Sequence, residues 1–150
     1  MEITTDQIKA LRDKTGVSVM HCREALIEAA GDMAKAEEIL HKRAAASAGK
    51  KVDRELAAGV IGSYVHDGTV GAMVLLASET DFVAKNPEFV ALAKELAMQV
   101  SAMAPENTEA LLAEPFIKDG SKTVKDLLHE ATQKFGERVE IAEFSRLSAR

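Results

Sequence analysis

The stretch GVIGSYVHDGTVGAMVLLAS, residues 59–78, contains the pattern that decides the fold. Two runs rich in Val, Ile, Leu and Tyr, Gly59 to His66 and Thr69 to Ser78, flank the pair Asp67-Gly68. An Asp-Gly pair favours a type I′ turn, because both central residues of that turn have positive φ. These residues therefore predict two antiparallel strands joined by a tight hairpin.

The second of these strands is apolar at nearly every position. Its two alternating sets of residues are Val70, Ala72, Val74 and Leu76, and Gly71, Met73, Leu75 and Ala77. A strand that is apolar on both faces is typical of the centre of a covered sheet. We therefore expect this strand to be central and covered, with helices packed on it.

The residues after the hairpin predict two helices and a third strand. Asn86-Pro87-Glu88 combines a capping amide, a first-turn proline and an acid that favours the helix dipole, and this helix should run to about Met103. Thr123 with Asp126 predicts a second helix that ends at Gly136, and residues 139–147 read as a strand. Residues 104–114 are expected to form a short irregular bridge.

The first forty-five residues predict three short helices. Thr4 with Gln7 forms a possible capping box, Ser18 and Asp32 are cap residues for the second and third helices, and Gly16 and Gly31 end the first and second. We thus expect an α+β protein with a three-helix module over residues 1–45 and a core of a three-stranded antiparallel sheet packed with helices over residues 57–150. Residues 46–56 read as a linker or an exposed helical extension.

Composition narrows the function classes. The 150 residues carry a formal net charge of -5 with acids and bases interleaved, which disfavours direct nucleic-acid binding. The one cysteine, Cys22, cannot form an internal disulfide, and no charged leader or long apolar span is evident. We expect a cytoplasmic protein without membrane contact.

Catalytic and cofactor motifs have little support. Gly120-Ser121-Lys122-Thr123 resembles part of a phosphate loop but lacks the Gly-Lys-Thr order and the upstream glycine. The four histidines are scattered and are not spaced as metal ligands. Cys22 falls on the inward face of its helix, where a thiol is usually an inert small hydrophobe. The sequence therefore predicts neither an enzyme nor a bound cofactor or metal.

The segment Thr80 to Asn86 is the candidate site. It leaves the central strand, makes about one helical turn capped by Thr80 or Asp81, and presents Phe82 as its first large apolar side chain. Burying a Phe stabilises a protein by roughly 2 to 3 kcal/mol, so the residue taken alone is most often part of a core. The sequence leaves these two interpretations of Phe82 open.

This segment and its neighbours resemble the elongation factor Ts family, the guanine-nucleotide exchange factors of the translational GTPase elongation factor Tu. The resemblance is carried by the residue runs 8–16, 24–26, 79–86, 116–119 and 135–139, together with Met20, Cys22 and Gly31-Asp32. The run Glu79-Thr80-Asp81-Phe82-Val83-Ala84-Lys85-Asn86 is similar to the family signature, and the N-terminal part is similar to the family's ubiquitin-associated-like module. The match spans most of the chain.

The resemblance implies a site and a partner. Thr80, Asp81, Phe82 and Val83 would disturb the magnesium and phosphate site of elongation factor Tu, and Arg12 and Met20 of the helical module would touch the same G domain. Val19 and His21 replace a methionine and an aspartate that the resemblance leads us to expect beside Met20. The alternative is an interaction adaptor that uses only the helical module.

The resemblance also implies a homodimer. Between Met103 and Phe116 the chain is shorter than in larger relatives, which leaves room for one sheet unit where they have two. Short members of the family complete this core by pairing two chains, and an apolar sheet would gain from such a contact.

Overall fold

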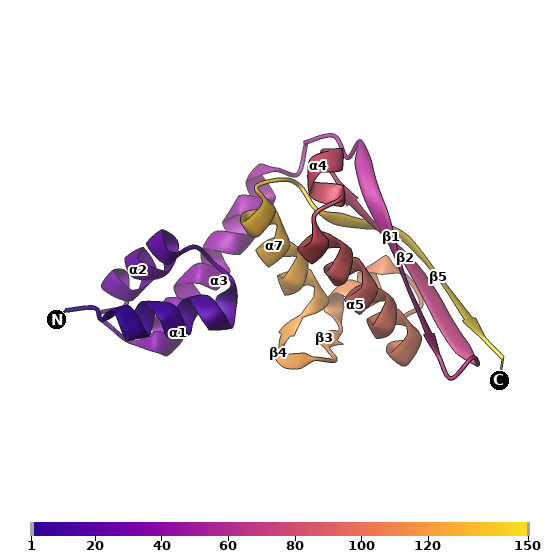
Figure 1. The fold of residues 1–150 in the computed structure, drawn as a ribbon, viewed down its shortest axis with the longest axis horizontal. Helices are drawn as coiled ribbons and strands as arrows, with labels where there is room; N and C mark the ends of the chain where they lie inside the picture. Colours follow the sequence, from indigo (N-terminus) through magenta and orange to yellow (C-terminus); the bar gives the residue numbers. More distant parts are fainter. Residues whose placement is uncertain (1, 150) are drawn as a thin grey trace.

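A computed structural model describes residues 2–149, in which three helices precede a core of helices and strands (Figure 1). The helical module lies at one end of an elongated molecule, and the three long strands lie at the other. The elements, in chain order, are α1 (Thr5–Thr15), α2 (Val19–Glu28), α3 (Met33–Lys50), β1 (Ala58–His66), β2 (Val70–Ser78), α4 (Asp81–Ala84), α5 (Pro87–Met103), α6 (Thr108–Ala113), β3 (Pro115–Phe116), β4 (Asp119–Thr123), α7 (Val124–Phe135) and β5 (Glu140–Ser148). The α+β class and the N-terminal three-helix module are confirmed.

The helix ends follow the capping residues of the sequence. Thr4 and Gln7 form the expected capping box, and Gly16 ends α1 in the left-handed conformation with φ of 73°. Asp32 caps α3 by accepting a hydrogen bond from the backbone N–H of Lys35 at 3.2 Å. The three helices enclose a core of their own, made of Leu11, Cys22, Ala25, Leu26, Ala29, Ala36 and Leu40.

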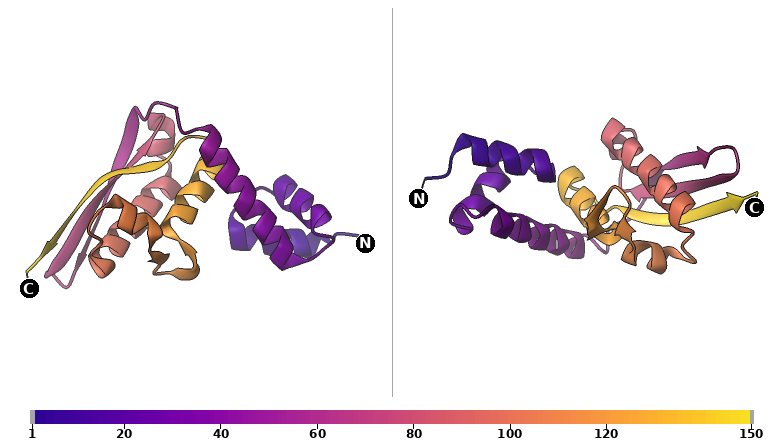
Figure 2. Two further views of the ribbon diagram at one scale, coloured as in Figure 1. Left: turned by 180° about the vertical axis from the view of Figure 1, so that it is seen from behind. Right: turned by 90° about the horizontal axis from the view of Figure 1, so that it is seen from below.

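Helix α3 continues beyond the module boundary that the sequence suggested at residue 45. It runs without a break to Lys50, and Ala44 is buried. Its C-terminal half lies beside α7 of the core, as the views of Figure 2 show. Residues 46–50 of this predicted linker or extension are helical, because the Ala-rich segment has high helix propensity and packs against the core.

The main sheet has the strand order β1-β2-β5, with both pairs antiparallel. The predicted hairpin turn is confirmed, since Asp67 and Gly68 have φ of 51° and 69° as a type I′ turn requires. The third strand also forms where expected, at Glu140–Ser148. Strand β2 is thus central in the sheet.

The described residues cover only one face of this sheet, which corrects the expectation that the central strand, apolar on both faces, is covered. Alternate residues of β2, including Val74 and Leu76, are fully buried beneath α5, whereas Met73 on the opposite face is 54% exposed. Figure 1 shows the helices of the core on one side of the sheet only. The chain between β2 and β5 supplies one helical layer, so apolar residues on the second face of the sheet remain exposed to solvent.

Strand β1 and helix α5 approach each other unusually closely at Gly62. A Cβ atom at this position would lie 2.2 Å from the backbone carbon of Ala93 and 2.4 Å from its oxygen. No side chain fits there without moving α5. Glycine at position 62 therefore sets the spacing between the sheet and its covering helix.

The bridge between α5 and α7 is ordered rather than irregular, which is a second correction. Asn107 caps α6 by accepting from the backbone N–H of Ala110 at 2.8 Å, and β3 pairs with β4. The buried side chain of Gln99 binds this segment, because its amide donates to the Pro115 carbonyl at 3.1 Å and its oxygen accepts from the Ile117 N–H at 2.9 Å. A long-range contact to Gln99 thus orders a segment with weak local signals.

Candidate functional site

The candidate site is centred on α4, a helix of only four residues between β2 and α5. Thr80 caps it, and its Oγ1 accepts a hydrogen bond from the backbone N–H of Val83 at 3.4 Å. Asp81 occupies the first turn, where a negative charge interacts favourably with the helix N-terminus. The sequence prediction of about one capped turn at this position is confirmed.

The two large apolar side chains of α4 point in opposite directions. Phe82 is 87% exposed, whereas Val83 is only 5% exposed and belongs to the main core. The structure therefore excludes Phe82 from the chain's own core. Val83, which the resemblance groups with Thr80, Asp81 and Phe82 as partner-binding, has its side chain in the main core and joins α4 to it.

The surroundings of Phe82 are polar and accessible. Thr80 and Asp81 are exposed, and a hollow of about 550 Å³ is lined by Asp81, Phe82, Lys85, Asn86 and Pro87. An exposed aromatic ring lacks the stabilisation of roughly 2 to 3 kcal/mol that burial would provide. Such a ring is available to be buried by another molecule.

The predicted contacts of the helical module lie on separate elements. Arg12 is exposed on α1, and Met20 is 64% exposed on α2. Val19, one of the two departures from the resemblance, is also exposed, so α2 carries an apolar surface at this point. Figure 1 shows α2 and α4 on the same upper side of the elongated molecule, which is compatible with one partner that contacts both.

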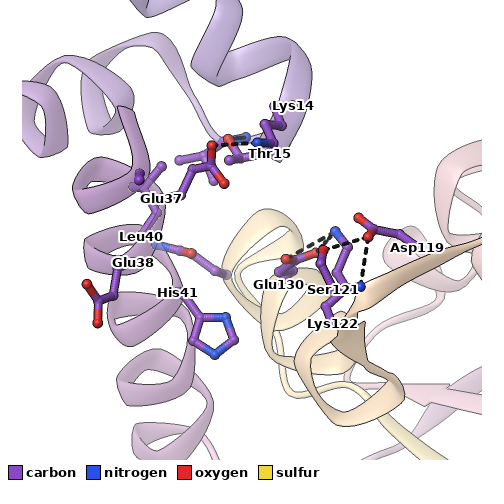
Figure 3. A pocket seen from close by; sticks show the side chains of 13 residues that line it. Lys14, Thr15, Glu37, Glu38, Leu40, His41, Asp119, Ser121, Lys122 and Glu130 are labelled. Carbon is purple, nitrogen blue, oxygen red and sulfur yellow. Dashed lines mark hydrogen bonds and ion pairs between the residues drawn. The ribbon is translucent and has the colours of Figure 1, made fainter. Parts of the chain in front are cut away.

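A cleft of about 370 Å³ separates the helical module from the core (Figure 3). Two ion pairs lie in this cleft: Lys122 binds Glu130 at 3.1 Å on the core side, and Lys14 binds Glu37 at 2.7 Å on the module side. Ser121 donates to Asp119, which lowers the pKa of that carboxyl. The segment that resembles a phosphate loop thus faces a cleft with its lysine already neutralised.

Two further titratable groups have perturbed pKa values. Burial raises the pKa of the Cys22 thiol, so this residue is an unreactive core thiol as the sequence indicated. Burial lowers the pKa of His129 on α7, and the nearby positive charge of Lys125 adds to this effect. Neither group lies on α4.

Residues 2–149 contain no cluster of three or more His, Cys, Asp or Glu side chains arranged to hold a metal ion. None of the helices over the same residues is both long enough and apolar enough to cross a membrane.

Sequence reasoning missed two features that bear on function. One is the open face of the sheet, which was expected to be covered. The other is Glu137, whose carboxylate contacts the start of α4 across 57 residues of sequence. The open face could not be distinguished from a covered one by apolar periodicity, and no local pattern marks a long-range hydrogen bond.

Comparison with known proteins gives a consistent result. Residues 79–150 match the family model described as Elongation factor TS. Elongation factor Ts of Desulforamulus reducens is 36% identical, with 97% of this chain and 88% of the relative covered, and that of Thermodesulfovibrio yellowstonii is 35% identical, with 97% and 96% covered. A chloroplastic Polyprotein of EF-Ts from Oryza sativa subsp. indica is 37% identical over 96% of this chain, which spans 17% of the polyprotein's length.

Proposed function

This chain belongs to the elongation factor Ts family, and we propose that it is the guanine-nucleotide exchange factor of elongation factor Tu. The proposal rests most directly on Phe82, which is 87% exposed at the tip of a short capped helix. In this role the protein makes and breaks no covalent bond. It changes how tightly its partner holds GDP.

The physical basis is a difference in affinity between two states of the partner. The Phe82 ring is buried only when the partner's magnesium-supporting side chains have moved aside, so this protein binds the nucleotide-free state more tightly. Thermodynamic linkage then requires that the protein weakens GDP binding by the same factor by which GDP weakens binding of the protein. Asp81, beside the ring, brings a negative charge towards the phosphate and magnesium region.

The helical module supplies the second part of the contact. Arg12 is exposed on α1 and Met20 on α2, and α2 lies on the side of the molecule that also carries α4 (Figure 1). Burial of one Phe side chain accounts for about a hundredfold in affinity at most, because each tenfold takes roughly 1.4 kcal/mol. Contacts through the module therefore contribute the remaining affinity and hold the GTPase while Phe82 acts.

The test is release of a fluorescent GDP analogue from elongation factor Tu, with this protein at several concentrations. The unaltered protein should accelerate release, and Phe82→Ala should reduce the acceleration by tenfold to about a hundredfold. Met103→Ala is the matched control, since Met103 is also an exposed apolar residue but lies at the opposite end of α5. GDP release that is no faster with the unaltered protein than without it would refute the proposal.

The same measurement separates exchange from the adaptor alternative. An adaptor that uses only the helical module predicts that Phe82→Ala keeps full function, while Met20→Ala impairs binding. Exchange predicts that both variants lose activity. The magnesium concentration adds a further check, because excess magnesium stabilises the GDP-bound partner and should oppose the effect of Phe82.

We extend the proposal to a homodimer formed through the open face of the sheet. This face carries exposed Ile61, Val65, Met73 and Leu147, which come from all three strands. Across the strands, Val65 pairs with Gly71, Gly71 with Leu147, and Ile61 with Leu75, so these apolar residues lie on one face of the sheet. A second copy offers the same surface, and an isologous contact would cover both. Light scattering that gives a monomer both alone and with the GTPase would contradict this.

The proposal also implies the setting of the protein. Translation takes place in the cytoplasm, and the interleaved charges of the chain give no basic surface for direct RNA or membrane contact. No cofactor is needed, because the magnesium ion and the nucleotide belong to the partner.

A further inference from the structure

The segment after α7 is tied to the start of α4 by one carboxylate. Glu137 follows Gly136, which ends α7 in the left-handed conformation and turns the chain towards α4. Its Oε1 accepts from the backbone N–H groups of Glu79 at 3.1 Å and Thr80 at 3.0 Å, and its Oε2 accepts from the Thr80 hydroxyl at 2.7 Å. Hydrogen bonds to an ionised carboxylate are about twice as strong as neutral ones.

These three bonds also determine how Thr80 caps α4. A carboxylate has no hydrogen to donate, so the single hydroxyl proton of Thr80 must point at Glu137. A lone pair of the same oxygen is then left to accept the Val83 N–H. Glu137 thus fixes the orientation of the capping hydroxyl as well as the backbone that precedes the helix.

A reciprocal contact strengthens this junction. Glu79 returns the interaction through its Oε2, which accepts from the backbone N–H of Arg138 at 2.6 Å. The Arg138 guanidinium in turn donates to the carbonyl of Arg54 at 2.6 Å, in the segment that joins α3 to β1. The start of α4 is therefore held against two segments that are distant in sequence.

Helix α4 needs such support because it is too short to be stable by itself. Forming one helical turn is unfavourable without neighbouring contacts, and α4 has four residues. Val83 anchors the inner side of α4, but Phe82 points away from the core, so packing against the core does not hold its ring in place. The direction of the exposed ring is set by the backbone of α4, and hence by the junction at Thr80.

We propose that Glu137 is the positioning residue for Phe82, holding Thr80 and α4 so that the ring enters the GTPase in one orientation. This inference rests on the proposed exchange activity and adds to it a residue that never touches the partner. Ordering α4 in advance removes an entropy cost that entry of the ring into the bound GTPase would otherwise carry. A loosened α4 would still present a Phe, but at a spread of positions.

The experiment compares Glu137→Ala and Glu137→Gln with a control, Glu106→Ala, at an exposed glutamate in the bridge before α6. Glu137→Ala should lower the maximal rate of GDP release about tenfold while the half-saturating protein concentration changes little, because the module contacts remain. Glu137→Gln keeps an oxygen for the two N–H groups but turns a donor towards the Thr80 hydroxyl, so a smaller loss is expected. Hydrogen exchange at the amides of residues 79, 80 and 83 should accelerate in Glu137→Ala.

A double-mutant cycle separates positioning from general destabilisation. In a Phe82→Ala background, Glu137→Ala should cause almost no further loss, whereas in a Met20→Ala background it should cause the full tenfold loss. Equal losses in both backgrounds would overturn the inference. So would an active unaltered protein whose Glu137→Ala variant matches Glu106→Ala. If the unaltered protein does not accelerate GDP release from elongation factor Tu, the proposed function fails, and the inference fails with it. If Glu137→Ala loses its far-ultraviolet circular dichroism, the cycle is run with Glu137→Gln.

Discussion

Two regions of the core expose apolar side chains, and they differ in extent and in how the side chains are held. On α4, a single ring stands 87% exposed on a backbone fixed by charged hydrogen bonds. On the open sheet face, several residues from three paired strands form a broad surface. A single ring suits a contact made only when a partner opens, whereas a broad rigid face suits continuous association. Exposure alone therefore does not define a role; the extent and support of the surface do.

The largest expected effect is a weakening of the proposed dimer by a substitution at the centre of the open face. Met73 lies opposite Ser63 on β1 and Ser145 on β5, and Met73→Lys would bury an unpaired charge in the proposed dimer. We expect the dimer to weaken by at least about a hundredfold, since leaving a charge unpaired in an interface costs several kcal/mol. Sedimentation velocity measures the change. Ile117→Lys, at an exposed apolar residue outside this sheet, is the control, and equal effects of the two would contradict the assignment of the face.

A substitution on the covered face of the same sheet should change the free energy of unfolding and not dimer formation. Gly62→Ala places a methyl group against the backbone of Ala93 and should lower the free energy of unfolding by about 2 to 3 kcal/mol. Gly120→Ala is the matched control, because a Cβ there meets no atom within 4 Å. Urea unfolding compares the two. Similar midpoints for both variants would show that α5 is not packed as closely as described.

A substitution that removes the aromatic ring of Phe82 but keeps an apolar side chain tests the role of the ring on α4. Phe82→Leu keeps an apolar side chain but loses the ring, so GDP release should fall by about tenfold, less than in Phe82→Ala. The dimer should be unaffected, because Phe82 lies outside the open sheet face. The fluorescent GDP assay and sedimentation velocity, applied to the same sample, test both parts. A Leu variant as active as the original would remove the need for an aromatic residue.

The smallest expected effect is on the pH dependence of stability, through His129, which lies outside both apolar regions. Burial lowers the pKa of His129 from its ordinary value of 6.5, with Lys125 and His41 adding to the lowering and Asp126 opposing it. Below that value the unfolded chain binds more protons than the folded chain, so stability should fall as the pH falls from 7 to 5.5. His129→Gln should reduce this fall, by less than about 1 kcal/mol because solvent screens a half-buried ring. Thermal unfolding across this pH range checks the sign; a steeper fall in the variant would contradict it.

Much of the fold could be predicted from local chemistry. The caps at Thr4, Asp32 and Thr123, and the turn at Asp67-Gly68, all form where the sequence indicated. These signals are local because a cap or a tight turn satisfies its hydrogen bonds within four residues. The ordered bridge was missed because Gln99, which holds it, is sixteen residues from Pro115.

The candidate site was predictable in part. The motif drew attention to Phe82, but whether the ring lay inside or outside could not be decided from apolar character, which is the same in both cases. Val83 shows the limit, since the neighbouring residue in the same motif turned out to be core. The orientation of α4 against the sheet separates the two side chains.

By itself, the sequence determined the order of the elements, their caps, the hairpin and the family resemblance, because each depends on residues close together in the chain. Only the tertiary structure decided which face of the sheet stays open, that Phe82 points outwards and that Glu137 holds the start of α4. Those features depend on packing and hydrogen bonds between segments more than fifty residues apart, and no periodicity in the chain encodes which segments meet.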